Sequence, residues 1–280
     1  MELEFYLYTP PWEWPPESGK VFLKILTDSN ARLPDRVIAA ELSGDSVVID
    51  ETLTDALLTI IGSPNEPDKL RATAAISLGP VLELADTSDF DDDFVDEVPI
   101  TKPTFEKMRE TLEKLYLDES IPKLVRRRIL EGSVRAPQDW HKNAIAKAYA
   151  TGDHDWILSA VFAMEHVRGF DKEILESLKA GDQDIRRHAI RAAGNWEVTE
   201  AWPAVKPLLK ASKTPKPLLL AAIEAANGLC PEEAAEILHQ LADSNDEEIR
   251  EAAEEALLMS APSDDDDFDD EEDEPPQWVN

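Results

Sequence analysis

The sequence predicts an all-α fold, an α-solenoid in which antiparallel helix pairs stack side by side. A ten-residue phrase, LRATAAISLG at residues 70–79, returns as IRRHAIRAAG at residues 185–194. Looser copies follow the same pattern, and successive copies start 55, 31, 29, 33 and 31 residues apart. A period near 30 residues with helical patterning is typical of repeat arrays, in which each repeat contacts only its neighbours. The looser copies start at Val125, Trp156, Leu218 and Ile249.

Local patterns predict the helices of the first half of the array. Residues 17–29 predict a short helix, residues 35–44 resemble a degenerate copy of the phrase, and residues 50–62 predict a helix that ends at Gly62. Between Phe105 and Tyr116, apolar residues recur at helical spacing, which predicts an amphipathic helix.

The later repeats carry clearer boundary signals. Asp153, Asp182 and Asp246 each stand three residues before a copy of the phrase, where a carboxylate caps a helix N-terminus or lies in its first turn. The second helices of these pairs are expected at residues 139–151, 171–180, 199–211 and 231–242.

The composition fits a helical protein with a sizeable core. Apolar residues make up 42% of the 280 residues, and Ala and Leu dominate among them. The single cysteine, Cys230, excludes a disulfide within the chain and a zinc site with two or more thiolates. We find no signal-peptide pattern at the start and no apolar run of roughly 18 residues, so we expect a soluble, cytoplasmic protein.

The charge is large and unevenly distributed. The net charge of −31 disfavours binding to nucleic acids and to anionic membranes. Residues 120–191 nevertheless hold 13 Lys/Arg against 10 Asp/Glu, a balance of +3, which leaves −34 for the rest of the chain. This asymmetry indicates a basic middle segment inside an acidic protein.

Three segments are expected outside the regular repeats. Residues 1–16, rich in Pro and Trp, predict an extended or turn-like N-terminal arm, which either forms a hydrophobic end cap or serves as a docking arm. Residues 86–97 form an acidic insert within a repeat domain that spans residues 17–260. Residues 261–280 are expected to be an acidic disordered tail, in which residues 264–274 hold ten acids.

The repeated phrase resembles a known repeat family. Asp182, Ile185, Arg186, Ala189 and Gly194 follow the core pattern of HEAT-like repeats of the phycobilisome-lyase (PBS lyase) type, over roughly residues 30–260. The resemblance implies an armadillo-type right-handed superhelix in which the helix with the Ile-Arg phrase generally lines the concave side. Small Ala residues at the phrase would let neighbouring helices approach closely.

Some proteins of this repeat class are enzymes, so we looked for their catalytic residues in this sequence. Deoxyhypusine hydroxylase, a HEAT-like enzyme, takes its iron ligands from His-Glu pairs, but none of the five histidines here is followed by Glu. No residues specific to bilin attachment are recognisable, and no histidine neighbours Cys230 in sequence to activate it. We therefore expect no catalytic residues, no metal and no cofactor. The histidines are His141, His154, His166, His188 and His239.

The basic middle repeats are the best candidate for a binding site. Arg187 and Arg191 are four residues apart and share one helix face. These residues either form a positive stripe on the concave side or pair with acids of adjacent repeats as a structural ladder. Trp196 lies just past a helix end, where partial exposure beside arginines is typical of interface hot spots. The candidate partner-binding residues are Arg126, Arg127, Arg186, Arg187, Arg191 and Trp196.

Three functions are compatible with these observations. The leading interpretation is a non-catalytic scaffold or adaptor that binds the acidic or extended segment of a partner protein. A second is an acidic mimic or chaperone of a basic partner, and a third is a lyase-like or maturation subunit associated with an enzyme. Residues 86–97 and 264–274 share an Asp-Phe-Asp-Asp core, so the tail could also fold back on the basic stripe of its own chain.

Overall fold

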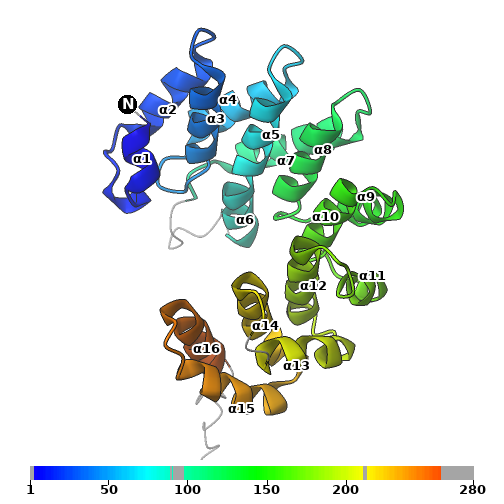
Figure 1. Ribbon diagram of the computed structural model, residues 1–280. Helices are drawn as coiled ribbons and strands as arrows, with labels where there is room; N and C mark the ends of the chain where they lie inside the picture. The colour runs from blue at the N-terminus through cyan, green and yellow to red at the C-terminus, as the bar shows by residue number, and fades with distance from the viewer. Residues whose placement is uncertain (1–2, 89, 91–97, 211–212, 260–280) are drawn as a thin grey trace, which may run out of the picture.

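The computed structural model describes residues 3–88, 90, 98–210 and 213–259 of the chain. Within these ranges the regular structure is helical, and the helices follow one another around an open arc from α1 to α16 (Figure 1). The α-helices are α1 Glu4–Tyr8, α2 Ser18–Thr27, α3 Leu33–Leu42, α4 Glu51–Gly62, α5 Asp68–Ser77, α6 Gly79–Thr87, α7 Lys102–Leu117, α8 Lys123–Ser133, α9 Asp139–Ala150, α10 His154–Ala163, α11 Asp171–Ser177, α12 Gln183–Asn195, α13 Trp202–Lys210, α14 Lys216–Leu229, α15 Pro231–Ala242 and α16 Glu247–Met259, with short 3-10 helices at Pro11–Glu13 and Thr199–Ala201.

The architecture is the all-α solenoid that the repeat spacing predicted. Helices α3, α5, α8, α10, α12, α14 and α16 pack in succession as one row, and each also packs against a helix of the second row. In the second half of the arc, α12, α14 and α16 lie on the inner side, while α11, α13 and α15 lie outside (Figure 1). The helices that carry the phrase therefore line the concave side there, as the resemblance implied.

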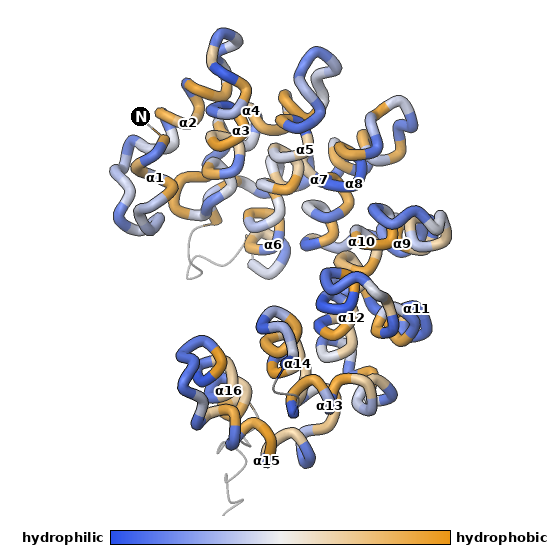
Figure 2. The backbone as a smooth tube through the Cα atoms, in the orientation of Figure 1, coloured by the Kyte–Doolittle hydropathy of each residue, from blue (hydrophilic) through white to orange (hydrophobic). Residues whose placement is uncertain are grey.

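The core lies between the two rows. Branched and Leu side chains at the repeated positions are buried, among them Leu70, Val125, Ile185 and Leu218, each at the start of a copy of the phrase. Hydrophilic segments gather at the turns that join α2 to α3, α4 to α5 and α7 to α8, whereas apolar segments run along the helices (Figure 2). Because the apolar side chains of each helix pair are buried against the adjacent pairs, a pair gains much of its stability from its neighbours.

The predicted helix boundaries are largely confirmed. Asp153 and Asp182 accept hydrogen bonds from the backbone N–H groups of Trp156 and Ile185, so they cap α10 and α12. Asp246 accepts in the same way from Ile249, at 3.4 Å. Helix α4 follows Asp50, which caps it, and ends at Gly62 as predicted.

The N-terminal segment differs from its prediction. We expected residues 1–16 to be extended or turn-like, but Glu4–Tyr8 forms helix α1 and Pro11–Glu13 a 3-10 turn. The segment packs on the array, because the rings of Tyr6 and Trp14 lie 4.8 and 5.6 Å from the ring of Phe22 in α2. Aromatic burial therefore prevails over the extended bias that the prolines impose.

Helix α6 was not predicted from the sequence. Pro80 stands near the first turn of this helix, where a proline is tolerated, so the chain continues as helix after the phrase ends at Gly79. Most of the acidic insert, residues 89 and 91–97, and the whole acidic tail, residues 261–280, lie outside the described residues. No described helix is long and apolar enough to cross a membrane.

Candidate functional site

Three neighbouring hollows of about 530, 560 and 330 Å³ follow the inner row from the N-terminal cap to α12. They share residues: Ile76 lines all three, whereas Glu41, Arg128 and Arg135 each line two. We call this continuous depression the concave groove. Its length along several repeats suits an extended segment better than a compact ligand.

The groove combines an apolar floor with charged edges. Ile76, Leu124, Leu158 and Phe162 supply the apolar surface. Leu124 is 39% exposed, so part of this apolar side chain is open to solvent in the groove. The charged lining of the two hollows nearest α8 is Lys69, Arg128, Arg135 and Arg187 against Glu41, Glu131 and Asp184.

The groove arginines are held by carboxylates of the same chain. Arg128 pairs with Glu131, Arg135 lies 2.7 Å from Glu83, and Arg187 lies 3.0 Å from Asp184. The Arg187 and Asp184 side chains are 31% and 64% exposed, so solvent and an incoming carboxylate can reach this pair. Among the described residues Lys69 forms no ion pair, although it lines the same groove. The arrangement therefore combines a structural ladder with accessible positive charge.

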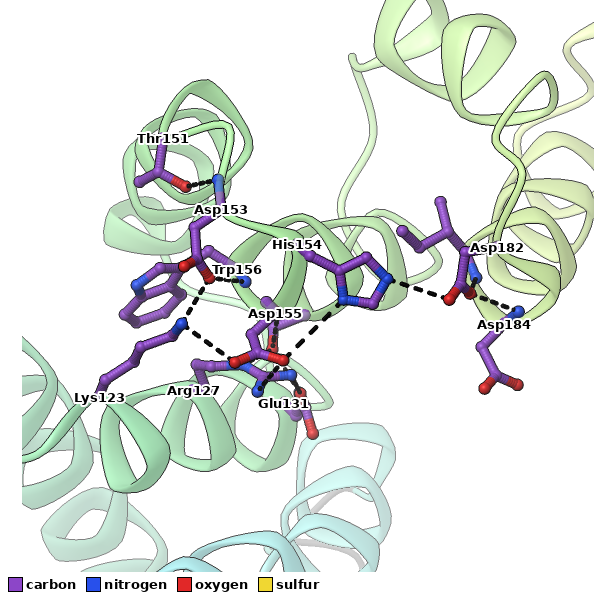
Figure 3. A network of polar contacts seen from close by, with 12 residues as sticks. Lys123, Arg127, Glu131, Thr151, Asp153, His154, Asp155, Trp156, Asp182 and Asp184 are labelled. Carbon is purple, nitrogen blue, oxygen red and sulfur yellow. Dashed lines mark hydrogen bonds and ion pairs between the residues drawn. The ribbon is translucent and has the colours of Figure 1, made fainter.

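Arg127 is not part of an accessible stripe. Its side chain is buried, its Nε donates to Ser159 Oγ at 2.9 Å, and its Nη1 lies 3.4 Å from Asp155 (Figure 3). Glu131, also buried, accepts from Ser159 Oγ at 2.5 Å. Arg127 thus joins α8 to α10, and its buried position corrects the expectation that it lies on the surface of the stripe.

Arg126 has a different role. Its Nε donates to the backbone oxygen of Tyr116 at 2.8 Å, which ties α8 to the end of α7. Its guanidinium carbon also lies over two rings, 5.3 Å from the centroid of Tyr116 and 5.8 Å from that of Trp156. The structure thus places Arg126 on the outer side of the helix pair, away from the concave groove.

The remaining candidates lie on or beside α12. Arg191 pairs with Glu224 of α14 through its Nε at 2.7 Å, and Arg186 is partly exposed with no ion pair among the described residues. Trp196 is half-buried: its Nε1 donates to Met164 O at 2.6 Å, and Arg168 lies over its ring. Of the six predicted residues, the structure brings only Arg187 into the groove lining.

Sequence reasoning missed most of the groove, although a signal was present. Ile76, Glu131 and Phe162 all occupy the seventh position of their copies of the phrase, and Arg128 and His188 occupy the fourth. Positions three apart share a helix face. In these copies this face lines the groove, whereas Arg191, the seventh residue of the copy that starts at Ile185, lies outside it and pairs with Glu224. The prediction rested instead on the arginines and Trp196.

A histidine cluster also borders the groove. His188 Nδ1 lies 2.5 Å from Glu165 Oε1, and the ring of Phe162 lies 5.3 Å from that of His188 and 5.4 Å from that of His166. Burial lowers the pKa of His166. Within the part of the chain that the structure describes, no group of three His, Cys, Asp or Glu residues converges as a metal site would require.

Comparison with known proteins agrees with this architecture. Residues 172–258 match the family of HEAT repeats. No curated protein matches the sequence. The HEAT match covers α12, α14 and α16, the helices that line the concave side of the second half.

Several solved structures resemble the HEAT-like array. YibA of Escherichia coli is 17% identical over 89% of this chain and 84% of that chain, with a TM-score of 0.48. An engineered protein is 16% identical over 86% of this chain and 67% of that chain, with a TM-score of 0.42. Human deoxyhypusine hydroxylase in complex with glycerol is 15% identical over 89% of this chain and 86% of that chain, with a TM-score of 0.39. None of the three carries an activity over to this chain.

Proposed function

We propose that this protein is a non-catalytic scaffold or adaptor that binds an extended segment of a partner protein in the concave groove. The observation that supports the proposal is the continuity of the groove across α3, α5, α8, α10 and α12, together with its apolar floor. Such a surface fits the alternating side chains of an extended peptide.

The charges around the groove define the partner segment. Apolar side chains would contact Ile76, Leu124 and Phe162, and carboxylates would lie near Lys69 and Arg187. The net charge of −31 opposes nucleic acids and anionic membranes over the rest of the surface. The proposal also includes a location and a repeat subtype. The single cysteine favours the cytoplasm, and the Ile-Arg phrase favours repeats of the phycobilisome-lyase type.

The test compares one groove position with one position outside the groove. A photo-crosslinking residue replaces Leu124 in the groove or Val47, which is 54% exposed in the turn between α3 and α4. The two full-length proteins are irradiated in cell extract, and the crosslinked peptides are identified by mass spectrometry. We expect position 124 to crosslink to peptides of a partner protein, and position 47 to crosslink to none of the same peptides.

Charge variants complete the test. Leu124→Glu should reduce recovery of the same partner by about tenfold, because a carboxylate replaces apolar contact area, and Val47→Glu should leave recovery unchanged. Both proteins are first shown to be folded by circular dichroism. Equal recovery with both variants, or crosslinks at position 47 but not at 124, would contradict the proposal. Arg127 is unsuitable for such a test, since its removal would break the buried hydrogen bond to Ser159 that joins α8 to α10.

A further inference from the structure

A second hollow of about 410 Å³ opens between the outer helices α7 and α9 and shares no residue with the concave groove. We call it the edge pocket. Its walls are aromatic: the ring of Tyr116 lies 5.0 Å from that of Trp140 and 6.3 Å from that of Trp156. An aromatic hollow of this size suits a planar side chain.

Two cations line the edge pocket without an ion-pair partner. Arg126 and Lys147 form no salt bridge with any described carboxylate, although many neighbouring cations of residues 120–191 do. The carboxylate in the pocket lining is Glu119, which is exposed. Asp118, just past α7, is close enough to Arg126 for the guanidinium to help lower the pKa of its carboxyl, but no described carboxylate forms an ion pair with Arg126 or Lys147.

An earlier repeat shows how an arginine at this position binds a carboxylate. Arg36 donates through Nε to Leu26 O, as Arg126 does to Tyr116 O, and both carbonyls lie ten residues earlier in the chain. The two Nη atoms of Arg36 then hold Glu66 of the next repeat, each at 2.7 Å. At Arg126 no carboxylate of the next repeat takes that place, and the ring of Trp156 lies beside the guanidinium group.

We propose that the edge pocket binds an acidic segment of a partner protein that carries an aromatic residue next to a carboxylate. The carboxylate takes at Arg126 the place that Glu66 takes at Arg36, with Lys147 as the second cation. The aromatic side chain stacks between Trp140 and Trp156. Bidentate arginine–carboxylate pairs and aromatic stacking both favour this chemistry over a plain acidic run.

The tail of the same chain is the other source of such a segment, and its length argues against it. From Met259 to Phe268 the chain spans at most ~30 Å when fully extended. From α16 to α8 the inner row takes four steps of 8–10 Å, or ~32–40 Å along the arc, and the edge pocket lies beyond it, between α7 and α9. Phe90 of the insert packs near Phe105, at the opposite end of α7 from Tyr116.

The experiment uses the full chain and a synthetic peptide with the sequence of residues 264–274 as the probe. The indole N–H signals of Trp140 and Trp156 are followed by ¹⁵N NMR during titration. We expect both to shift and saturate, and a peptide with Ala in place of its Phe to bind about tenfold more weakly at equal charge.

A matched pair of protein variants distinguishes binding in the edge pocket from general electrostatic attraction. Lys147→Glu should weaken binding roughly tenfold, whereas Lys142→Glu should not, because Lys142 lies on the same helix but its Nζ approaches Gly169. Equal binding of the Phe and Ala peptides, equal effects of the two variants, or no peptide binding would overturn the proposal. So would a shift of the Trp140 and Trp156 signals caused by Phe268→Ala in the chain itself, since it would identify the tail as the occupant. These measurements do not involve the concave groove. A negative result here would therefore leave the proposal of a scaffold function unaffected.

Discussion

At the residue scale, the arginine in the second position of the phrase closes the preceding helix. Arg36, Arg71 and Arg126 each donate Nε to a backbone oxygen ten residues earlier, at 3.0, 2.9 and 2.8 Å. These oxygens belong to the last turns of α2, α4 and α7, whose carbonyls have no partner within their helix. In these three copies the repeated arginine therefore has a structural role, because it satisfies a carbonyl at the end of the preceding helix.

His141 is the buried titratable residue with the clearest pH consequence. It is fully buried, its Nδ1 accepts from the backbone N–H of Gln138 at 2.9 Å, and its Nε2 lies 3.0 Å from Ser133 Oγ. Burial lowers the pKa of His141 to about 4. The hydrogen bond from Gln138 requires the neutral ring, so the structure holds this histidine uncharged at neutral pH.

We predict that stability falls between pH 7 and pH 5 in part because of His141. The folded-state pKa lies below the unfolded value of about 6.5, so the unfolded chain binds more protons in this range and stability is lost as the pH falls. The loss amounts to about 2 kcal/mol from pH 7 to pH 5. Urea unfolding at the two pH values measures it.

The comparison that isolates this effect is His141→Gln. The variant should be less stable at pH 7 but should show a smaller decrease between pH 7 and pH 5 than the wild type. The exposed His239→Gln, for which no ion pair is found among the described residues, should keep the full decrease. If the His141→Gln decrease equals that of the wild type, another group causes the pH dependence.

The burial of a single residue is not always predictable from the sequence. Arg127 and Arg187 occupy the same position of their phrases, and only the second is accessible. The difference comes from the next repeat, which supplies Ser159 and Asp155 to Arg127. Since these partners belong to a different helix, no local pattern around residue 127 could predict its burial.

At the scale of elements, glycines set the distance between inner helices. Gly194 of α12 ends its phrase, Gly228 of α14 lies one residue past the end of the next, and each faces the backbone of a neighbouring inner helix. Gly44 and Gly132 do the same against Ser77 and Ala75. The absence of a side chain lets these helices approach closely, as small Ala residues elsewhere in the phrase do.

We predict that Gly194→Ala destabilises the protein by about 1–3 kcal/mol. A Cβ at this position would lie 2.6 Å from Cα of Ala225, and backbone atoms cannot move aside without shifting α14. The loss should exceed the gain of up to ~1 kcal/mol in helix propensity. Chemical denaturation measures the difference.

Gly62→Ala is the control, because Gly62 ends α4 and has open space around its Cα. It should leave stability unchanged or raise it slightly. Similar effects of the two substitutions would show that propensity outweighs packing.

Most elements follow from the sequence, because capping residues and apolar spacing are local signals. Asp153 and Asp182 marked the starts of α10 and α12, and Gly62 marked the end of α4. Helix α1 was missed, since its formation depends on burying Tyr6 and Leu3 against the array rather than on its own residues. The prolines at residues 10, 11, 15 and 16 all follow α1, so they do not interrupt it.

At the scale of the whole molecule, each helix pair of the array packs mainly against the adjacent pairs. Inner helices contact the next inner helix and their own outer partner, so stability is transmitted from repeat to repeat. The ends therefore need caps. At the N-terminal end Leu3, Tyr6 and Trp14 cover Phe22, and Trp14 also donates its Nε1 to Thr9 O at 2.8 Å.

The cap leads to a prediction about where the molecule opens. Trp14→Ala removes a buried ring from the end of the array, which should cost about 3–5 kcal/mol locally. Because each repeat is stabilised by its neighbours, the loss should concentrate in α2 and α3 and fade toward α12. Hydrogen exchange should show faster amide exchange in α2 and α3 and unchanged exchange in α14 and α16. Trp12→Ala, two residues away and 78% exposed, should alter neither end. Uniform acceleration along the whole chain after Trp14→Ala would instead mean that the solenoid unfolds as one cooperative unit.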